Sequence, residues 1–313
     1  MTTTGGQKIT TILVYGATGS QGEPVARRLL EAGHRVRILV RQPERAGDLR
    51  ALGAEVMQGD LSDAEATRRA STGADGVVFH LPFAGGNPMD RPTQARNVID
   101  AAREAGVRLL VWNASGEIAP AGTGNPGLDV RLDVLEVIQA SRLPYVVLQP
   151  TGYMENFLGP WTAPEVASRN VFTYPVPNEV RMQWIASDDL GKFAAYAFAH
   201  PDLAPLNLKV AGPESLSGEE VAERFSRALG RAIRFEPLSP EVFGQKMDTI
   251  YPGMGRFAAM AYARAFADPP SMSSNVDVDS ALQKMPVPLT PLEDWVREHA
   301  DAFGTREAAD QHA

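Results

Sequence analysis

The sequence predicts an α/β protein built on a doubly wound parallel sheet, with a smaller C-terminal lobe. Two observations predict this class. Short apolar runs of strand length alternate with amphipathic helical stretches up to about residue 150, as successive βαβ units do. In addition, the first of these runs leads through a glycine-rich turn directly into a helical stretch. Beyond residue 150 the periodicity weakens and Pro, Gly and aromatic residues become frequent, so a separate lobe is expected there.

The elements of the N-terminal region follow from hydrophobic periodicity. Apolar, β-branched runs predict six strands, and stretches with apolar residues on one helical face predict the helices between them. The strands are expected at 9–14, 35–40, 54–58, 76–81, 108–112 and 145–148, and the clearest helices at 23–30, 92–105 and 128–140.

The C-terminal half is expected to return once to the sheet. Residues 151–181 are predicted to be a loop region over the carboxyl edge of the sheet. Residues 183–190 are expected to lead into a helix that continues to 198, with Ser187, Asp188 or Asp189 as its cap, and a strand is expected at 206–210. Ser217 and Glu220 match a capping box, and Thr290 is expected to cap a last helix containing Trp295. The predicted domains are 8–150 with 183–212, a lobe of 151–182 with 213–303, and a disordered tail at 304–313.

The composition excludes several classes of protein. The chain has 313 residues, a formal net charge of -8 and no block of Lys and Arg, which argues against nucleic acid as a partner. It has no cysteine, so disulfides and thiolate metal sites are excluded, and no His/Asp/Glu set has metal-ligand spacing. No signal peptide is visible, and no run approaches the roughly 20 apolar residues that cross a membrane. We therefore expect a soluble, cytoplasmic protein without a metal.

The glycine-rich turn is the clearest functional signal. Gly16, Gly19 and Gly22 follow a strand and open a helix, so backbone N–H groups stand free at the positive end of a helix dipole. A pyrophosphate binds at such a place, and glycines let it approach closely. A purely structural turn is the alternative. The flanking strand and helix favour nucleotide binding.

Arg41 ends the second predicted strand, where an acidic residue would accept hydrogen bonds from the ribose of NAD. A guanidinium at this edge suits the 2′-phosphate of NADP instead, although a solvated surface arginine is the alternative. Asp60 ends the third strand, and it either accepts a hydrogen bond from the adenine amino group or caps the following helix.

Other cofactor candidates come from the turn and from the strand ends, because ligands bind outside the carboxyl ends of parallel strands. These further candidates are Thr18, Ser20, Gln21, Leu61, Leu81, Pro82, Asn113, Ala114, Pro150, Gly152 and Asn156.

These motifs resemble the NmrA-like branch of the atypical short-chain dehydrogenase/reductases, over roughly residues 9 to 300. The resemblance implies a Rossmann-type sheet that binds NADP(H), with the C-terminal lobe closing over the nicotinamide. It also implies either a quinone- or dye-type reductase or a dinucleotide-binding regulator of other proteins. The runs that carry it are Tyr15–Gly19, Val40–Arg41, Gly59–Leu61, Val111–Ser115, Leu143–Tyr145, Gln149–Phe157 and Gly212–Ser217.

The chain departs from the wider superfamily at the general acid. The helix after the fifth strand ordinarily carries Tyr and Lys four residues apart, and the corresponding positions here are Gly127 and Arg131. Arg131 is therefore expected to hold a ribose hydroxyl or a substrate oxygen rather than to give up a proton. Ser115 is a candidate to hydrogen-bond a substrate carbonyl or to cap a turn, and Tyr153 to face the nicotinamide or to pack in the core. His80 is a possible proton donor, with a structural role favoured.

Two functions follow from these signals. The leading one is NADPH-dependent reduction of a small apolar, conjugated acceptor, which needs no acid in the transition state; the other is a non-catalytic sensor of NADP(H) with a protein partner. A homodimer is compatible with either function. A stretch rich in methionine and aromatic residues, from Met247 to Phe266, is expected to be mostly core, with part of it available to line an apolar substrate pocket.

Overall fold

The computed structural model describes residues 8–81, 90–122 and 126–304, and the chain divides into two compact units. The first unit comprises 1–150, 187–209 and 281–288, and the second comprises 151–186, 210–280 and 289–313. Residues 183–186, which the sequence assigned to the sheet-forming domain, thus belong to the second unit, and 281–288 belong to the first. Most of the tail predicted from residue 304 lies outside the described residues.

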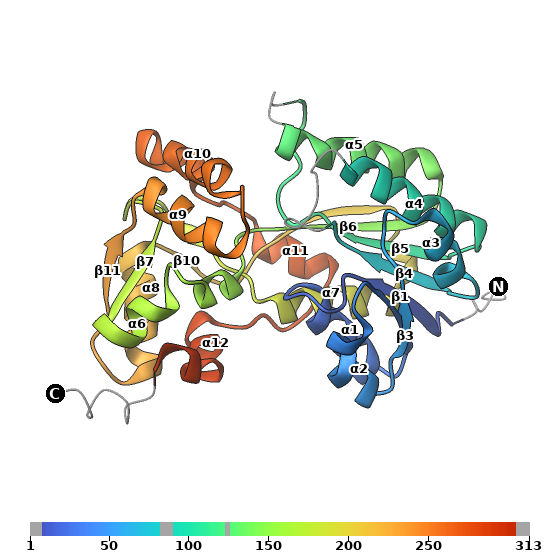
Figure 1. Ribbon diagram of the computed structural model, residues 1–313, viewed down its shortest axis with the longest axis horizontal. Helices are drawn as coiled ribbons and strands as arrows, with labels where there is room; N and C mark the ends of the chain where they lie inside the picture. The colour runs from blue at the N-terminus through green and yellow to red at the C-terminus, as the bar shows by residue number, and fades with distance from the viewer. Residues whose placement is uncertain (1–7, 82–89, 123–125, 305–313) are drawn as a thin grey trace. The chain divides into compact units, whose positions relative to one another are not determined.

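The first unit is built on a seven-stranded sheet (Figure 1). Its strand order is β3-β2-β1-β4-β5-β6-β9, and the pairs from β3 to β6 are all parallel. The register places Val14 of β1 opposite Ile38 of β2 and Val78 of β4. The chain order reverses between β1 and β4, which is the switch point where doubly wound sheets bind ligands. The strands are β1 (Thr11–Tyr15), β2 (Arg35–Val40), β3 (Glu55–Gln58), β4 (Gly76–Phe79), β5 (Leu109–Asn113), β6 (Tyr145–Pro150) and β9 (Leu206–Val210).

Helices cover both faces of this sheet, as Figure 1 shows, with α3, α4 and α5 on one face and α1, α2 and α7 on the other. The predicted α/β class is confirmed, and each of the first six predicted strands is present within three residues at either end. The helices are α1 (Gly22–Glu31), η1 (Pro43–Ala46), α2 (Gly47–Ala51), α3 (Ala64–Ser71), α4 (Arg91–Glu104), α5 (Pro126–Ser141), α7 (Ser187–Ala199), η4 (Pro201–Leu203) and α11 (Val278–Lys284), the last of which begins among second-unit residues.

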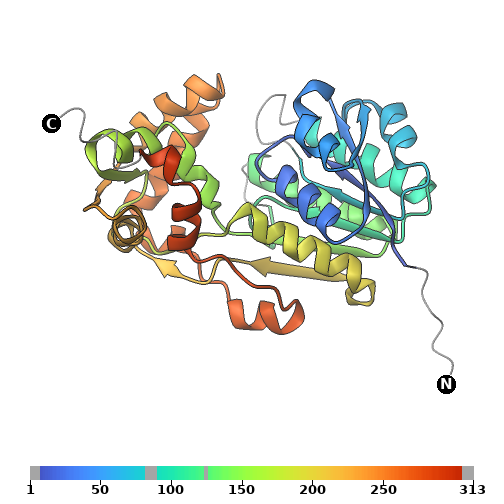
Figure 2. The ribbon, with the colours of Figure 1, turned by 90° about the horizontal axis from the view of Figure 1, so that it is seen from below.

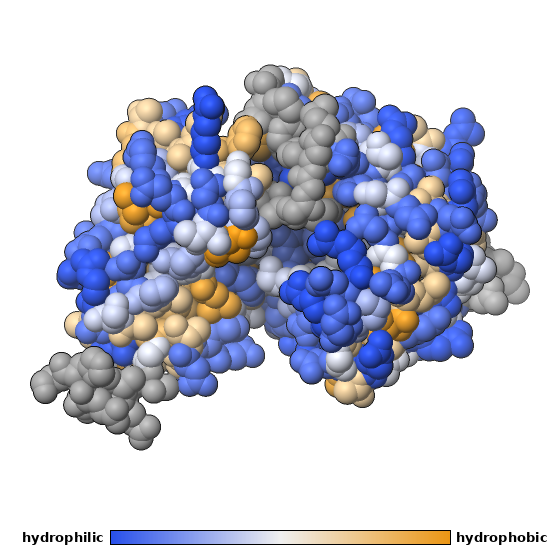
Figure 3. Space-filling model, viewed as in Figure 1, coloured by the Kyte–Doolittle hydropathy of each residue, from blue (hydrophilic) through white to orange (hydrophobic). Residues whose placement is uncertain are grey.

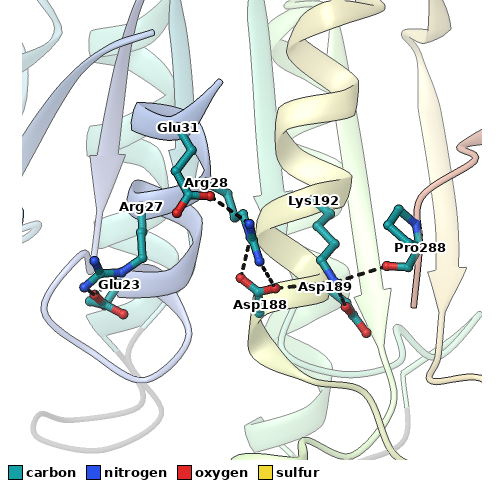
Figure 4. A network of polar contacts seen from close by, with 8 residues as sticks. All are labelled: Glu23, Arg27, Arg28, Glu31, Asp188, Asp189, Lys192 and Pro288. Carbon is teal, nitrogen blue, oxygen red and sulfur yellow. Dashed lines mark hydrogen bonds and ion pairs between the residues drawn. The ribbon is translucent and has the colours of Figure 1, made fainter. Parts of the chain in front are cut away.

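Helices α1 and α7 lie side by side (Figures 1 and 2), and charged groups join them (Figure 4). The Arg28 guanidinium donates two parallel hydrogen bonds to Asp188, with Nε to Oδ1 at 2.6 Å and Nη2 to Oδ2 at 2.7 Å. The next residue, Asp189, has a fully buried side chain and pairs with Lys192 at 2.7 Å. Lys192 also donates to the Pro288 carbonyl at 3.1 Å. This network fixes α7 against both α1 and the segment after α11.

The second unit is formed by short elements around an aromatic core. Phe157 lies at its centre, with ring centroids 4.6 Å from Trp184 and 5.1 Å from Phe172. Strand β7 pairs in parallel with β11, and β8 pairs with β10 in antiparallel. The elements are η3 (Met154–Leu158), α6 (Ala163–Arg169), β7 (Val171–Tyr174), β8 (Met182–Gln183), β10 (Ser215–Leu216), α8 (Gly218–Leu229), β11 (Arg234–Pro237), α9 (Pro240–Ile250), α10 (Gly255–Ala267), η5 (Pro269–Met272), α12 (Leu292–Glu298) and η6 (Ala300–Phe303).

Some predictions for the second half are wrong. Residues 151–181 are not one loop, because they contain η3, α6 and β7. The N-cap of α12 is Pro291 rather than Thr290. Helix α7 begins at Ser187, the first of the three residues expected to cap it. The capping box of α8 is confirmed, with Ser217 Oγ accepting from the Glu220 N–H and Glu220 accepting from the Ser217 N–H. Over the described residues, no helix is long and apolar enough to cross a membrane.

Candidate functional site

The turn after β1 folds tightly because two of its glycines have no room for a side chain. Gly16 has φ +73°, and a Cβ there would lie 2.3 Å from the His80 ring. A Cβ on Gly22 would lie 2.3 Å from the Gly16 carbonyl oxygen. Gly19 donates its N–H to that same oxygen at 3.0 Å, yet a Cβ on Gly19 would keep 3.4 Å from it. Gly16 and Gly22 are therefore required by the turn itself, whereas Gly19 is exposed and leaves space above the turn.

The start of α1 is open to a ligand. Gln21 is the N-cap residue, but its side chain makes no capping hydrogen bond to the helix. Thr18 is half-buried and Ser20 is exposed beside it. The first two N–H groups of α1 both donate to the Gly19 carbonyl, at 3.1 and 3.0 Å. A phosphate here would therefore bind N–H groups of the turn, at the positive end of the helix dipole.

The Gln21 side chain instead joins the turn to the end of β5. Its Oε1 accepts hydrogen bonds from Asn113 Nδ2 at 3.0 Å and from Ser115 Oγ at 2.8 Å. Asn113 Oδ1 in turn accepts from the Ser115 N–H at 2.9 Å. Ser115 has φ +53°, a left-handed conformation that is strained for a residue with a side chain. The structure thus brings together three residues that the sequence singled out, from two separate stretches.

Arg131 holds the same segment from the other side. Its Nε donates to the Ala114 carbonyl at 2.9 Å and its Nη2 to the Ser115 carbonyl at 3.1 Å. A Cβ on Gly116 would lie 2.9 Å from that Nη2, so the close approach requires glycine there. Gly127, which we expect at the position of the superfamily's tyrosine, lies in the first turn of α5. Two of the N–H groups of Arg131 are committed to the backbone, and its role toward a ribose or a substrate stays a prediction.

Arg41 and Asp60 stand at the ends of β2 and β3, with Arg41 Nε and Asp60 Oδ2 3.8 Å apart and both side chains exposed. Asp60 Oδ1 accepts from the Ser62 N–H at 2.8 Å and does not cap α3. The cap is Asp63, which accepts from two N–H groups of the first turn. The capping alternative for Asp60 is therefore wrong. The neighbouring Leu61 accepts a hydrogen bond at its carbonyl from Asn97.

His80 follows β4 and lies against Gly16. Burial lowers the pKa of its imidazole to about 4, although its side chain remains partly exposed. His80 is therefore neutral at neutral pH, which favours the structural interpretation over that of a proton donor. Leu81 lies just beyond it, and Pro82 lies outside the described residues.

Pro150 ends β6 in the first unit, and the remaining candidates lie in the second. A Cβ on Gly152 would lie 2.7 Å from the Trp184 ring. Tyr153 is buried, and it forms an isolated parallel bridge with Ile185. Asn156 lies in η3.

The stretch from Met247 to Phe266, in the second unit, is only partly core. Met247 is buried, and the Tyr262 hydroxyl lies 2.9 Å from that of Tyr174. Phe257 and Met260 of α10 are instead 65% and 64% exposed, and Figure 3 shows orange and tan atoms over this helix. Two further side chains of the stretch, Tyr251 and Phe266, are exposed as well, so the expectation that most of it is core is wrong.

A small cavity of about 30 Å³ lies in the first unit, beside the carboxyl ends of β4 and β5. Its polar lining consists of Ser115 and Arg131, which the sequence singled out, and of Arg91 and Trp112, which it did not. Trp112 lies in β5 and packs in the core that α4 and α5 cover. Nothing in the sequence indicated that Arg91, at the start of α4, comes near it.

Comparison with known proteins identifies the family. The model of the NmrA-like family matches residues 8–295. The chain belongs to the NmrA-like family. It is 30% identical to an NAD(P)H azoreductase of Xenophilus azovorans, over 94% of this chain and 99% of the relative. It is 31% identical to a (4-alkanoyl-5-oxo-2,5-dihydrofuran-3-yl)methyl phosphate reductase of Streptomyces griseus, over 93% and 99%.

Solved structures agree on the fold of this NmrA-like chain. A triphenylmethane reductase of Citrobacter sp., crystallised with NADP(H), matches with a TM-score of 0.75 and 23% identity, over 92% of this chain and 99% of that one. At this identity the likeness shows the Rossmann-type fold.

Proposed function

We propose that this protein is an NADPH-dependent reductase that delivers hydride to an apolar, conjugated acceptor such as a quinone, an enone or a dye. The observation that carries the proposal is the glycine turn at the switch point of the sheet, with Gly19 open above it and no side chain capping α1. Two relatives matched over nearly their whole length are named reductases, which supports the same activity.

The residues of the first unit fit the dinucleotide. Backbone N–H groups of the turn before α1 would hold the pyrophosphate, and Arg41 would hold the 2′-phosphate in place of its weak contact with Asp60. The side chains of Asn113 and Ser115 are held by Gln21, so the turn and the end of β5 would together form one wall of the cofactor site. When bound, NADPH supplies the hydride.

The acceptor class follows from the missing acid. Gly127 stands at the tyrosine position, and the high pKa of an arginine prevents Arg131 from acting as an acid. Hydride transfer to a simple ketone leaves a basic alkoxide, and general acid catalysis there is commonly worth ~10²–10⁴ in rate. A quinone or an enone leaves a stabilised anion, which water protonates after the hydride has moved.

The test is a panel of acceptors mixed with the protein and NADPH, followed at the NADPH absorbance band. Quinones, enones and azo dyes should be reduced, whereas simple ketones should not. Deuterium at the transferred position of NADPH should slow turnover clearly, and solvent deuterium should slow it little. A large solvent isotope effect, with a pH profile controlled by one group, would overturn the mechanism. Tight NADPH binding without turnover of any acceptor would establish the sensor alternative instead.

A further inference from the structure

The hydrogen bonds around Ser115 have a fixed direction. Its backbone N–H donates to Asn113 Oδ1 at 2.9 Å, so the other end of the Asn113 amide is the Nδ2 donor. That nitrogen lies 3.0 Å from the Gln21 side chain, and because a donor must face an acceptor, the Gln21 atom is Oε1. Since Oε1 can only accept, the Ser115 hydroxyl donates its proton to it at 2.8 Å. One backbone N–H thus sets the direction of the whole network.

Ser115 is held at three points, which keeps its hydroxyl in this orientation. Besides its N–H and its hydroxyl, its carbonyl accepts from Arg131 Nη2 at 3.1 Å. Its φ of +53° is costly for a residue with a Cβ, and such strain persists only where the surrounding structure enforces it. Turning the hydroxyl toward a ligand would break the bond to Gln21. The proton of Ser115 is therefore committed before any ligand binds.

In this state Ser115 Oγ can only accept a hydrogen bond from a ligand. A hydroxyl has one proton and two lone pairs, and the proton is used on Gln21. Ser115 remains partly exposed, so a ligand can reach it. Quinones, enones and azo dyes carry oxygens or nitrogens at their reducible groups that accept hydrogen bonds. Such an atom would meet the lone pairs of Ser115, so the group that donates to Ser115 must come from elsewhere.

The cofactor carries suitable donors on its nicotinamide half. Ser115 follows β5, which lies beyond β4 from the switch point, whereas Arg41 and Asp60 follow β2 and β3 on the other side. A dinucleotide that spans the switch point, with its adenosine half at Arg41, would therefore extend its nicotinamide half toward β4 and β5. The donors of that half are the carboxamide NH2 group and the ribose hydroxyls.

We propose that Ser115 binds the nicotinamide half of the cofactor as a hydrogen-bond acceptor and does not donate to the hydride acceptor. This inference rests on the proposed reductase function and deepens it. With Gly127 at the position of the tyrosine, Ser115 is the second side chain that supplies no proton to the reacting oxygen. Ser115 is instead a specificity-determining residue for the cofactor.

The test compares the wild type with Ser115→Ala by calorimetry. The probes are NADP, its 3-acetylpyridine analogue, in which a methyl group replaces the amide NH2, and adenosine 2′-phosphate 5′-diphosphate, which lacks the nicotinamide and its ribose. Ser115→Ala should weaken NADP binding by about two- to ten-fold, the range expected for one neutral hydrogen bond. The third probe keeps the 2′-phosphate and both phosphates of the bridge, so its affinity should not change.

The acetylpyridine analogue distinguishes the two donors. If the carboxamide donates, Ser115→Ala should leave the affinity for the analogue unchanged, whereas equal weakening of NADP and the analogue would assign the donor to the ribose. Ser115→Gly is the matched backbone control, because glycine adopts this φ without strain. It should reproduce the effects of Ser115→Ala, since both variants remove the same hydroxyl.

Two results would overturn the inference. The first is an unchanged affinity for NADP in both variants. The second is equal weakening of all three probes, because the substitution would then act through Gln21 and the turn.

The titrations need no turnover, so they separate this inference from the proposed function. NADP affinity that depends on Ser115 as expected, without reduction of any acceptor, would overturn the reductase alone. Unchanged cofactor affinity in Ser115→Ala, with a lower kcat/KM for a quinone, would overturn this inference alone and make Ser115 a donor to the hydride acceptor.

Discussion

The three glycines of the turn after β1 are required for different reasons. Gly16 and Gly22 are fixed by contacts within the protein, to His80 and to the Gly16 carbonyl. Gly19 makes no such close contact and is exposed to solvent. A substitution at Gly19 therefore tests cofactor binding, whereas one at Gly22 tests the stability of the turn.

Gly19→Leu should abolish NADPH binding in calorimetry, a loss of about a hundred-fold or more, while the melting temperature stays near that of the wild type. The leucine side chain would occupy the space through which a pyrophosphate approaches. Gly47→Leu is the matched control, because Gly47 is exposed on α2 with open space around it. Unchanged affinity in Gly19→Leu would place the cofactor elsewhere.

Arg41→Ala should weaken NADP binding by about ten- to a hundred-fold, because a charge-assisted pair to the 2′-phosphate is lost. Affinity for NAD should barely change. Titrations with both cofactors measure the difference, and Arg45→Ala, exposed one turn later, controls for the loss of a surface charge. Equal weakening of NAD and NADP would refute the assignment.

His80 makes stability depend on pH. Its pKa is about 4 in the folded chain, below the ordinary 6.5, so the unfolded chain takes up the proton first as pH falls. The free energy of unfolding should therefore decrease between pH 6.5 and pH 4, by up to about 3 kcal/mol.

Urea unfolding at several pH values measures this effect by the difference between the wild type and His80→Gln, since other groups titrate in the same range. The variant should lose this part of the pH dependence. His200→Gln, which removes an exposed imidazole, should keep it. Parallel pH curves for the wild type and His80→Gln would show that burial of this ring does not shift its pKa.

At the scale of elements, sequence patterns predicted the helices and strands whose contacts are with residues nearby in the chain. The strand at 35–40 was predicted with its observed bounds, because its apolar run is followed by a turn and its partner lies one helix away. The strand Val171–Tyr174 was missed, because only its pairing with Arg234–Pro237, 60 residues later, shows that it is one. Helix α6 is short and follows Pro-rich sequence, so its periodicity spans fewer than two clear turns.

The residues of the candidate site that follow strands directly were predictable from the sequence. The turn, Arg41 and Ser115 follow strands directly, and parallel strands bring their carboxyl ends together. That Gln21 bonds both Asn113 and Ser115 depends on side-chain geometry over more than 90 residues of sequence, which no pattern encodes. Arg91 was missed for the same reason.

The buried pair on α7 should matter more to stability than the pairs on α1 (Figure 4). Asp189 has no exposed side-chain surface, so Lys192→Met would take the opposite charge away from a buried carboxylate. We expect a loss of about 3 kcal/mol in urea unfolding. Arg27→Met breaks an exposed pair with Glu23 on α1 and should cost no more than about 0.5 kcal/mol. Similar losses in both variants would contradict a special role for the buried pair.

At the scale of the whole molecule, each unit has buried hydrophobic clusters of its own. Proteins of this kind often unfold in more than one step, so a single transition midpoint need not describe both units. The division was foreseeable from the change in composition after residue 150, whereas the assignment of 281–288 to the first unit was not.

The placement of the tryptophans allows the unfolding of each unit to be followed by fluorescence. Trp112 is the one tryptophan of the first unit, and Trp161, Trp184 and Trp295 all lie in the core of the second. Indole emission responds to the polarity around the ring, so each unit carries its own fluorophore. Emission of a Trp112→Phe chain comes from the second unit alone, and its difference from the wild type isolates the first. The melting of each unit is thus visible without any added label.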